Sequence, residues 1–216
     1  MAVGTDELAT ASLVDLAVDR LRQEILSGDL PPGTRLVEEQ IRGRFGISRG
    51  PLREALRLLA EQGLVEHLPR RGVRVATLSD QDVAELFDVR DVLERHAVGV
   101  AFASADPGPD LDGVRRELTA MRAAASADDA FRAAEAHRRY HAEVVALAGR
   151  RQLCAVYEPI LVRLQVHMAT NLRREARARA PRDGVLRHER LLAALEGGDA
   201  PTVLAALATH GAQTYL

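Results

Sequence analysis

The sequence predicts a mainly α protein with two parts, a small N-terminal domain of helices and a β-hairpin, and an all-α antiparallel helical bundle. Apolar residues follow helical spacing almost without interruption from Ser79 onward. The β-type runs LVEH and VRVA lie together before this point and are separated by a short turn. Aromatic residues form only 3% of the chain and tryptophan is absent, so the cores must be built from Leu, Val and Ala. That composition favours helices.

The length of 216 residues suits two small domains. Because β-type residues give way to continuous helix near Ala76–Ser79, we predict domains at 1–78 and 79–216. The content of 47% hydrophobic and 28% charged residues is typical of globular proteins and argues against disorder. No run approaches eighteen apolar residues, and the N-terminus lacks a basic start followed by an apolar core. We therefore expect a soluble, cytoplasmic protein with no membrane partner.

The N-terminal domain is predicted to contain three helices before the hairpin. Gly28 ends the first helix, and the segment LPPGTR after it is predicted to be a loop. Gly46 makes a tight turn between the second and third helices. Ser48 is a good N-cap for the third helix, which tolerates Pro51 in its first turn. The helices are expected at 12–27, 37–45 and 48–63, after a loose arm at 1–11.

The order of these elements defines the fold of the N-terminal domain. A helix, a tight turn and a second helix are followed by two short strands that are joined by the turn LPRRG. This order is that of a winged helix-turn-helix. We therefore predict an N-terminal winged helix-turn-helix followed by the all-α antiparallel bundle.

Positive charge is concentrated in the N-terminal domain. The whole chain has a net charge of −2, but residues 35–74 contain nine arginines and five glutamates, a net charge of +4. Arg49 opens the third helix, where free backbone N–H groups and positive charge suit phosphate, and arginine can bind one guanine with two hydrogen bonds. Arg70, Arg71 and Gly72 lie at the hairpin tip, where a residue without a side chain lets the backbone approach a minor groove. For any single arginine, a solvated surface position is the alternative.

These residues also resemble a known family. The runs ILSGDLPPGTRLVE, SRGPLREAL, GLVE and RRGVRV occur in this order within residues 21–76 and closely resemble the DNA-binding domain of GntR-type bacterial transcription regulators. The resemblance implies a domain that binds double-stranded operator DNA. Together with the hairpin tip, it implies DNA contacts from Arg35, Ser48, Arg49, Arg53, Arg71 and Gly72.

The C-terminal domain is predicted to consist of six helices. The segments ADPGPD and ARAPRDG break the helical pattern. The helices are expected at 80–104, 110–126, 129–148, 151–179, 183–196 and 200–213.

Four histidines are spaced so that the bundle brings them together. His137 and His141 lie four residues apart in one predicted helix and therefore project from one face. His188 and His210 lie eleven residues before and after Asp199, which can cap the second helix of a hairpin, so antiparallel helices place them at the same height. Four imidazoles that converge inside a bundle can form a transition-metal site. The alternative is four satisfied polar groups in a helical core.

The C-terminal helices resemble the ligand domain of the FadR subgroup, which is called FCD. The matching residues are LFDVRDVLERHAV, the pair Tyr140-His141 and the run RHERLLAALEGGDAPTVLAALATH. In metal-binding members, one helix supplies an Asp and a His four residues later, and two later helices supply one His each. The resemblance implies metal ligands at His141, His188 and His210, with His137 in place of the usual Asp.

This replacement affects the choice of metal. A set of imidazoles brings no negative charge and suits Zn, Ni, Cu or Fe. We expect one divalent ion, with Zn the first candidate and Ni or another transition metal as alternatives, bound by His137, His141, His188 and His210. The opposite outcome is that the replacement disables the site and leaves His137 as a hydrogen-bond donor in a pocket. Metal affinity is expected to fall as the pH drops below the ordinary histidine pKa of about 6.5, because the ligands must be neutral.

Arg90 is a candidate contact for a small-molecule effector. It lies in the run DVRDVLE, where the subgroup has an arginine that can face the cavity. An arginine near a metal suits a carboxylate, such as an organic acid, whose oxygens complete the coordination. Arg90 and Asn171 are the expected effector contacts. A plain salt bridge between Arg90 and Glu94, four residues later, is the alternative.

Together these features predict a transcription regulator, specifically a repressor, that binds a palindromic operator as a homodimer and responds to a metal and an effector. An enzyme is not expected, because no HExxH motif and no recognisable nucleophile–base spacing occur. Two other functions remain open at this point. One is a metalloenzyme such as a zinc hydrolase, and the other is a DNA-binding dimer whose C-terminal domain senses nothing.

Overall fold

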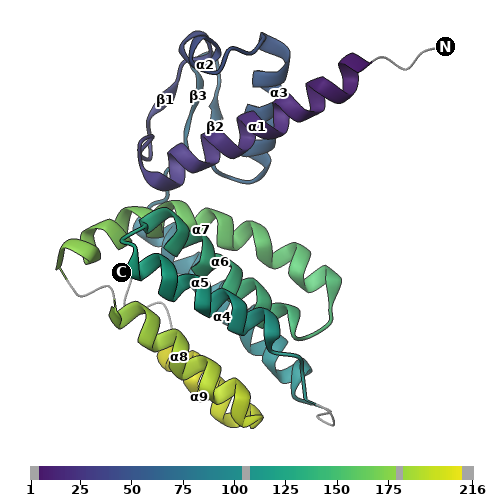
Figure 1. Ribbon diagram of the computed structural model, residues 1–216, viewed down its shortest axis with the longest axis vertical. Coiled ribbons are helices and arrows are strands. Elements are labelled where there is room, and N and C mark those ends of the chain that lie inside the picture. Colours follow the sequence, from purple (N-terminus) through teal and green to yellow (C-terminus); the bar gives the residue numbers. More distant parts are fainter. Residues whose placement is uncertain (1–4, 104–107, 179–181, 211–216) are drawn as a thin grey trace. The chain divides into compact units, whose positions relative to one another are not determined.

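The computed structural model describes the backbone of residues 5–103, 108–178 and 182–210, and within these it leaves out the side chains of 5–12, 130, 168–178 and 182–184. The chain divides into two compact units, Met1–Thr77 and Leu78–Leu216 (Figure 1). The first unit is a winged helix-turn-helix with a small sheet, and the second is a helical bundle. The predicted fold class is therefore confirmed.

The first unit combines helices with a three-stranded antiparallel sheet of strand order β1-β3-β2. Val65 of β2 pairs with Val75 of β3, and Arg35 of β1 pairs with Arg74 on the other side of β3. In chain order the elements are α1 (Thr5–Ser27), β1 (Arg35–Leu36), α2 (Glu38–Phe45), α3 (Arg49–Glu61), β2 (Val65–Leu68) and β3 (Gly72–Val75).

Two predictions for this unit are wrong in detail. Helix α1 begins at Thr5, although residues 1–11 were expected to form a loose arm, because Leu, Ala and acidic residues in this stretch are adequate helix formers. Strand β1 lies where a loop was expected. It has only two residues and is held by its pairing with β3. This contact is non-local, so the local sequence pattern does not predict it.

Helix α3 is fixed by an apolar stripe that packs against α1. Leu52, Leu56 and Leu59 are buried at the spacing of one helix face, and Leu21 of α1 is buried with them. The opposite face of α3 carries Arg49 and is left exposed. The packing therefore determines which residues of α3 are presented to a partner.

Gly46 is expected to be the sensitive glycine of the helix-turn-helix. It ends α2 in the left-handed region, at φ 66°, and its N–H donates to the carbonyl of Arg42. Gly46→Ala should lower the free energy of unfolding by about 1 kcal/mol, because an L-residue is strained there. Gly43→Ala, an exposed change in the interior of the same helix, should instead raise it by up to about 1 kcal/mol. Urea denaturation of both variants checks these opposite signs, and equal effects would contradict the account.

The second unit consists of antiparallel helices, with α5 packed against α6 and α8, and α7 packed against α4 and α6. Buried Leu118, Tyr140, Leu191 and Val203 belong to its largest core cluster. No helix among the described residues is long and apolar enough to cross a membrane. The helices are α4 (Asp80–Ala101), α5 (Asp112–Ser126), α6 (Ala130–Ala146), α7 (Arg151–Ala178), α8 (Arg182–Gly197) and α9 (Ala200–His210).

The hairpin of α8 and α9 forms as its sequence predicts. Gly198 adopts φ 70°, and Asp199 accepts a hydrogen bond from the backbone N–H of Thr202 at 3.0 Å, as an N-cap does. The two helices lie side by side (Figure 1). This places His188 and His210 opposite each other, with their ring centroids 4.3 Å apart.

Candidate metal centre and nucleic-acid interface

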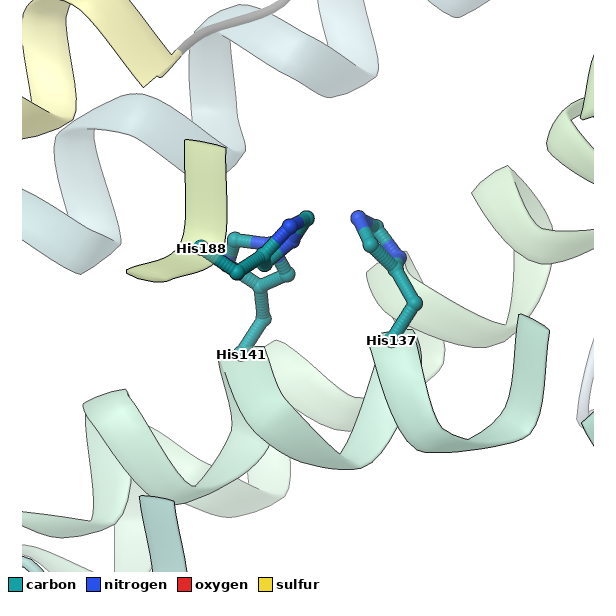
Figure 2. Close-up of side chains that lie close together, drawn as sticks. All are labelled: His137, His141 and His188. Carbon is teal, nitrogen blue, oxygen red and sulfur yellow. The ribbon is translucent and has the colours of Figure 1, made fainter. Parts of the chain in front are cut away.

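Four histidine side chains from three helices meet in the interior of the second unit. His137 and His141 project from the same face of α6 toward His188 of α8 (Figure 2). Ring nitrogens of these three residues all lie within 4.8 Å of one another. His210 of α9 joins them through His141, and all four side chains are buried. The structure thus brings together all four histidines that the sequence singled out.

The distances between these rings fit a shared metal ion. Nε2 of His141 lies 3.3 Å from Nε2 of His188 and 3.3 Å from Nε2 of His210. Two nitrogens bound to one tetrahedral zinc at about 2.0–2.1 Å are roughly 3.3–3.4 Å apart. The residues present therefore fit a transition metal in their nitrogen donors, and His188 and His210 fit it in their spacing from His141.

Tyr140 helps to hold the cluster together. Its hydroxyl donates to the backbone carbonyl of His188 at 2.9 Å, and its ring packs against the rings of His141 and His188. Burial raises the pKa of this hydroxyl, so it remains a donor at all ordinary pH values. The contact ties α8 to α6 at the level of the histidines.

Burial also keeps the imidazoles of His137, His141 and His210 neutral. It is the main cause that holds the pKa of His137 and His141 well below 6.5, and the neighbouring Arg90 guanidinium lowers both further. Burial and then Arg90 lower the pKa of His210 to about 4. Neutral imidazoles are the metal-binding form. The pH range in which protonation competes with a metal is therefore lower than the ordinary histidine pKa suggests.

This arrangement predicts an acid-sensitive second unit when metal is withheld. The unfolded histidines titrate near 6.5 and the folded ones lower, so the unfolded state binds more protons below pH 6.5. The free energy of unfolding should fall as pH drops from 6.5 toward about 4, by up to about 1.4 kcal/mol per pH unit for each such histidine. Urea denaturation in chelator, followed by tyrosine fluorescence, measures it, because all three tyrosines lie after residue 79. His210→Asn should reduce the slope, and an unchanged slope would contradict the assignment.

Arg90 and Glu94 lie beside the histidines as a buried ion pair. Nε of Arg90 is 2.9 Å from Oε1 of Glu94, which confirms the salt bridge that the spacing allowed. Nη2 of Arg90 lies 2.8 Å from both ring nitrogens of His141. The hydroxyl of Tyr157 donates to the same Glu94 oxygen. Sequence reasoning missed Tyr157, because its approach depends on the packing of α7 against α4.

A small pocket of about 10 Å³ adjoins the cluster. Its lining includes Arg90, His137, Arg138 and Gln165. This volume is about that of one water molecule. Asn171, the second expected effector contact, lies on α7 outside the residues whose side chains the structure describes.

The first unit presents exposed arginines at the start of α3. Ser48 takes the N-cap position, but its hydroxyl makes no capping hydrogen bond and is left available. Arg49 is exposed and has no ion pair among the described residues, whereas Arg53 pairs with Glu38 at 3.1 Å. Arg35 of β1 is also exposed. A binding partner that contacts Arg53 must displace the exposed Glu38 carboxylate, and the loss of such a surface ion pair costs little free energy.

The hairpin tip carries the other predicted contacts. Arg70 and Gly72 both have positive φ, 60° and 88°, and Arg71 donates its backbone N–H to the carbonyl of Leu68. A Cβ at position 72 would meet no atom within 4 Å, so glycine is needed there for its backbone and not for space. Arg71 and Gly72 are exposed at the tip.

Comparison with known proteins identifies the family. Residues 13–75 match the gntR family of bacterial regulatory proteins, and residues 85–213, more than half of the chain, match the FCD domain. The chain belongs to the GntR family, with an FCD domain.

Relatives agree with this assignment. An HTH-type transcriptional regulator of Agrobacterium vitis is 33% identical to this GntR-family chain over 147 residues, which are 67% of this chain and 86% of the relative. The probable D-xylose utilization operon transcriptional repressor of Paenarthrobacter nicotinovorans is 28% identical over 217 residues, 100% of this chain and 92% of the relative. The crystal structure of a GntR regulator from Rhodococcus sp. RHA1 has a TM-score of 0.78 at 25% identity and covers 92% of this chain and 93% of its own.

Family membership excludes one of the functions considered above, the metalloenzyme. This GntR-family chain is a transcription regulator and not an enzyme, so the zinc hydrolase alternative is discarded. Its winged helix-turn-helix is a DNA-binding domain, and the helical unit is its FCD domain.

Proposed function

We propose that this regulator is a repressor whose FCD domain binds one divalent metal and a small carboxylate effector, and that the effector modulates binding of a homodimer to a palindromic operator. The observation that carries the proposal is the cluster of four buried imidazoles. Buried polar groups normally have bonding partners, and here the Nε2 atoms of His188 and His210 each lie at metal-ligand spacing from Nε2 of His141, with His137 beside them.

The metal ligands in this proposal are His137, His141, His188 and His210. A neutral, all-nitrogen set favours zinc or another transition metal over manganese or magnesium, which prefer oxygen. A bound metal would act as a Lewis acid that can bind an anionic group. The chain's own contribution is to hold neutral imidazoles in a dry interior and to keep His188 in place through Tyr140.

Arg90 is the proposed contact for the effector carboxylate. It lines the pocket beside His137 and already binds a carboxylate, that of Glu94. An effector carboxylate would make charge-assisted hydrogen bonds of the same kind. Because the pocket has room for about one water molecule, effector binding must widen it, which gives a physical route from the ligand to the surrounding helices.

The proposed operator contacts are Arg35, Ser48, Arg49, Arg53, Arg71 and Gly72, with α3 in the major groove and the hairpin tip near the minor groove. A single recognition helix reads too few base pairs for useful specificity, so two copies should bind two inverted half-sites. Names of relatives such as the D-xylose operon repressor support a repressor.

The proposal is tested with the full chain and a DNA duplex selected from a random pool. Operator affinity is measured by fluorescence anisotropy for the zinc-loaded protein, the chelated protein, and the zinc-loaded protein with a panel of small mono- and dicarboxylates. At least one comparison should differ by about 5-fold or more, the range of ordinary allosteric coupling. Equal affinity throughout would identify a DNA-binding dimer that senses nothing. Footprinting should show two inverted half-sites, and a single asymmetric half-site with a monomer in solution would contradict the dimer.

A further inference from the structure

His141 occupies the centre of the histidine cluster, and its two ring nitrogens face different partners. Nε2 faces Nε2 of His188 and Nε2 of His210, each at 3.3 Å. Nδ1 faces the other way and lies 2.9 Å from Oε1 of Glu94. A neutral imidazole carries one proton, so the ring can offer a lone pair to a metal at Nε2 only when the proton is on Nδ1.

The contact with Glu94 selects that tautomer. Nδ1 and Oε1 of Glu94 are at ion-pair distance, 2.9 Å, and because a carboxylate oxygen can only accept, this contact favours the proton on Nδ1. Nη2 of Arg90 lies 2.8 Å from both ring nitrogens, so this contact does not distinguish the two tautomers. With the proton on Nδ1, the lone pair of the ring is on Nε2. The opposite tautomer would set two acceptors against each other at Glu94 and leave Nε2 with a proton among the other histidines.

Glu94 is itself held firmly. Its Oε1 accepts hydrogen bonds from Nε of Arg90, at 2.9 Å, and from the hydroxyl of Tyr157. The side chain is buried, and its three partners come from α4, α6 and α7. A carboxylate fixed from several directions can orient the ring that it contacts.

We propose that Glu94 is the positioning residue of the metal centre: its carboxylate holds the proton of His141 on Nδ1 and so directs the Nε2 lone pair toward His188 and His210. The inference rests on the proposed metal function and adds to it a residue that does not touch the metal. It also assigns a role to a buried carboxylate beside four proposed ligands of which none is a carboxylate.

Two variants separate the role of the acceptor oxygen from that of the charge. Glu94→Gln removes the charge but keeps an oxygen that accepts from Nδ1, whereas Glu94→Leu removes the acceptor at similar volume. Glu117→Gln is the matched control, because Glu117 is also buried in this unit but pairs with Arg116. Zinc affinity of the full chain, by competition with a chromophoric chelator, should fall about 10–100-fold in Glu94→Leu, be largely restored in Glu94→Gln and be unchanged in Glu117→Gln.

A second measurement does not depend on the folding of any variant. Long-range ¹H–¹⁵N correlation spectra of the zinc-free wild-type protein should show His141 protonated on Nδ1. Protonation on Nε2, equal losses in Glu94→Gln and Glu94→Leu, or full zinc affinity in Glu94→Leu would each overturn the inference. If the wild-type protein itself binds no zinc, both the proposed metal function and this inference fail. If the wild-type protein binds zinc and Glu94→Leu binds it equally well, only this inference fails.

Discussion

His188→Ala and His210→Ala proteins are expected to lose the divalent metal that the wild-type chain retains. Both residues contribute a ring nitrogen 3.3 Å from Nε2 of His141, and removal of one imidazole leaves a set that binds transition metals much more weakly. Elemental analysis after mild purification gives the metal per chain. Retention of one metal per chain by both variants would place the site elsewhere.

A matched control separates the loss of a ligand from the loss of any histidine. His96 lies on the exposed side of α4, so His96→Ala should retain the metal. Basal DNA binding of all three variants should be largely intact, because the DNA-binding unit is a separate compact unit. The response of DNA binding to metal or effector should disappear only in the His188 and His210 variants.

Substitution of Arg49 or Arg53 by alanine should weaken operator binding by about 1–3 kcal/mol each, roughly 5- to 150-fold, which is the value of a good base or phosphate contact. Both are exposed near the N-terminus of α3, where free N–H groups and positive charge meet. The Arg53 pair with Glu38 is exposed, so its loss on binding offsets little of this gain.

Arg57 provides the control on the same helix. It lies one turn beyond Arg53 and is already paired with Glu54 and Glu61. Arg57→Ala should therefore change operator affinity much less. Gel-shift titration of folded proteins measures all three, and unchanged affinity in both Arg49→Ala and Arg53→Ala would reject α3 as the recognition helix.

Local patterns predicted most of the helices and the pairing of the histidines within α6 and within the hairpin of α8 and α9, whereas the meeting of the two pairs depends on packing between His141 and His188, 47 positions apart. The i,i+4 spacing of His137 and His141 and the symmetric placement of His188 and His210 about Asp199 depend only on regular helix geometry and on a capped hairpin. Both features are fixed within a few turns of chain. Periodicity is therefore a sufficient guide to them.

Features that depend on long-range packing could not be predicted in this way. Tyr157 reaches Glu94 across 63 positions, and β1 exists only because β3 pairs with it. The depressed histidine pKa values follow from burial, which the sequence does not state residue by residue. Ser48 has the sequence of an N-cap, yet its hydroxyl makes no capping bond, and Pro51 at the N3 position has no backbone N–H to donate to it.

The most direct test of the metal centre is an anomalous difference map from crystals of the full chain, collected on both sides of the absorption edge of the metal found by elemental analysis. We expect one strong peak per chain, within about 2.0–2.1 Å of ring nitrogens of His137, His141, His188 and His210 if the metal is zinc. Two results would contradict this metal centre. One is a stoichiometric metal whose peak lies away from these histidines, and the other is well-defined density for the four hydrogen-bonded imidazoles with no anomalous peak among them.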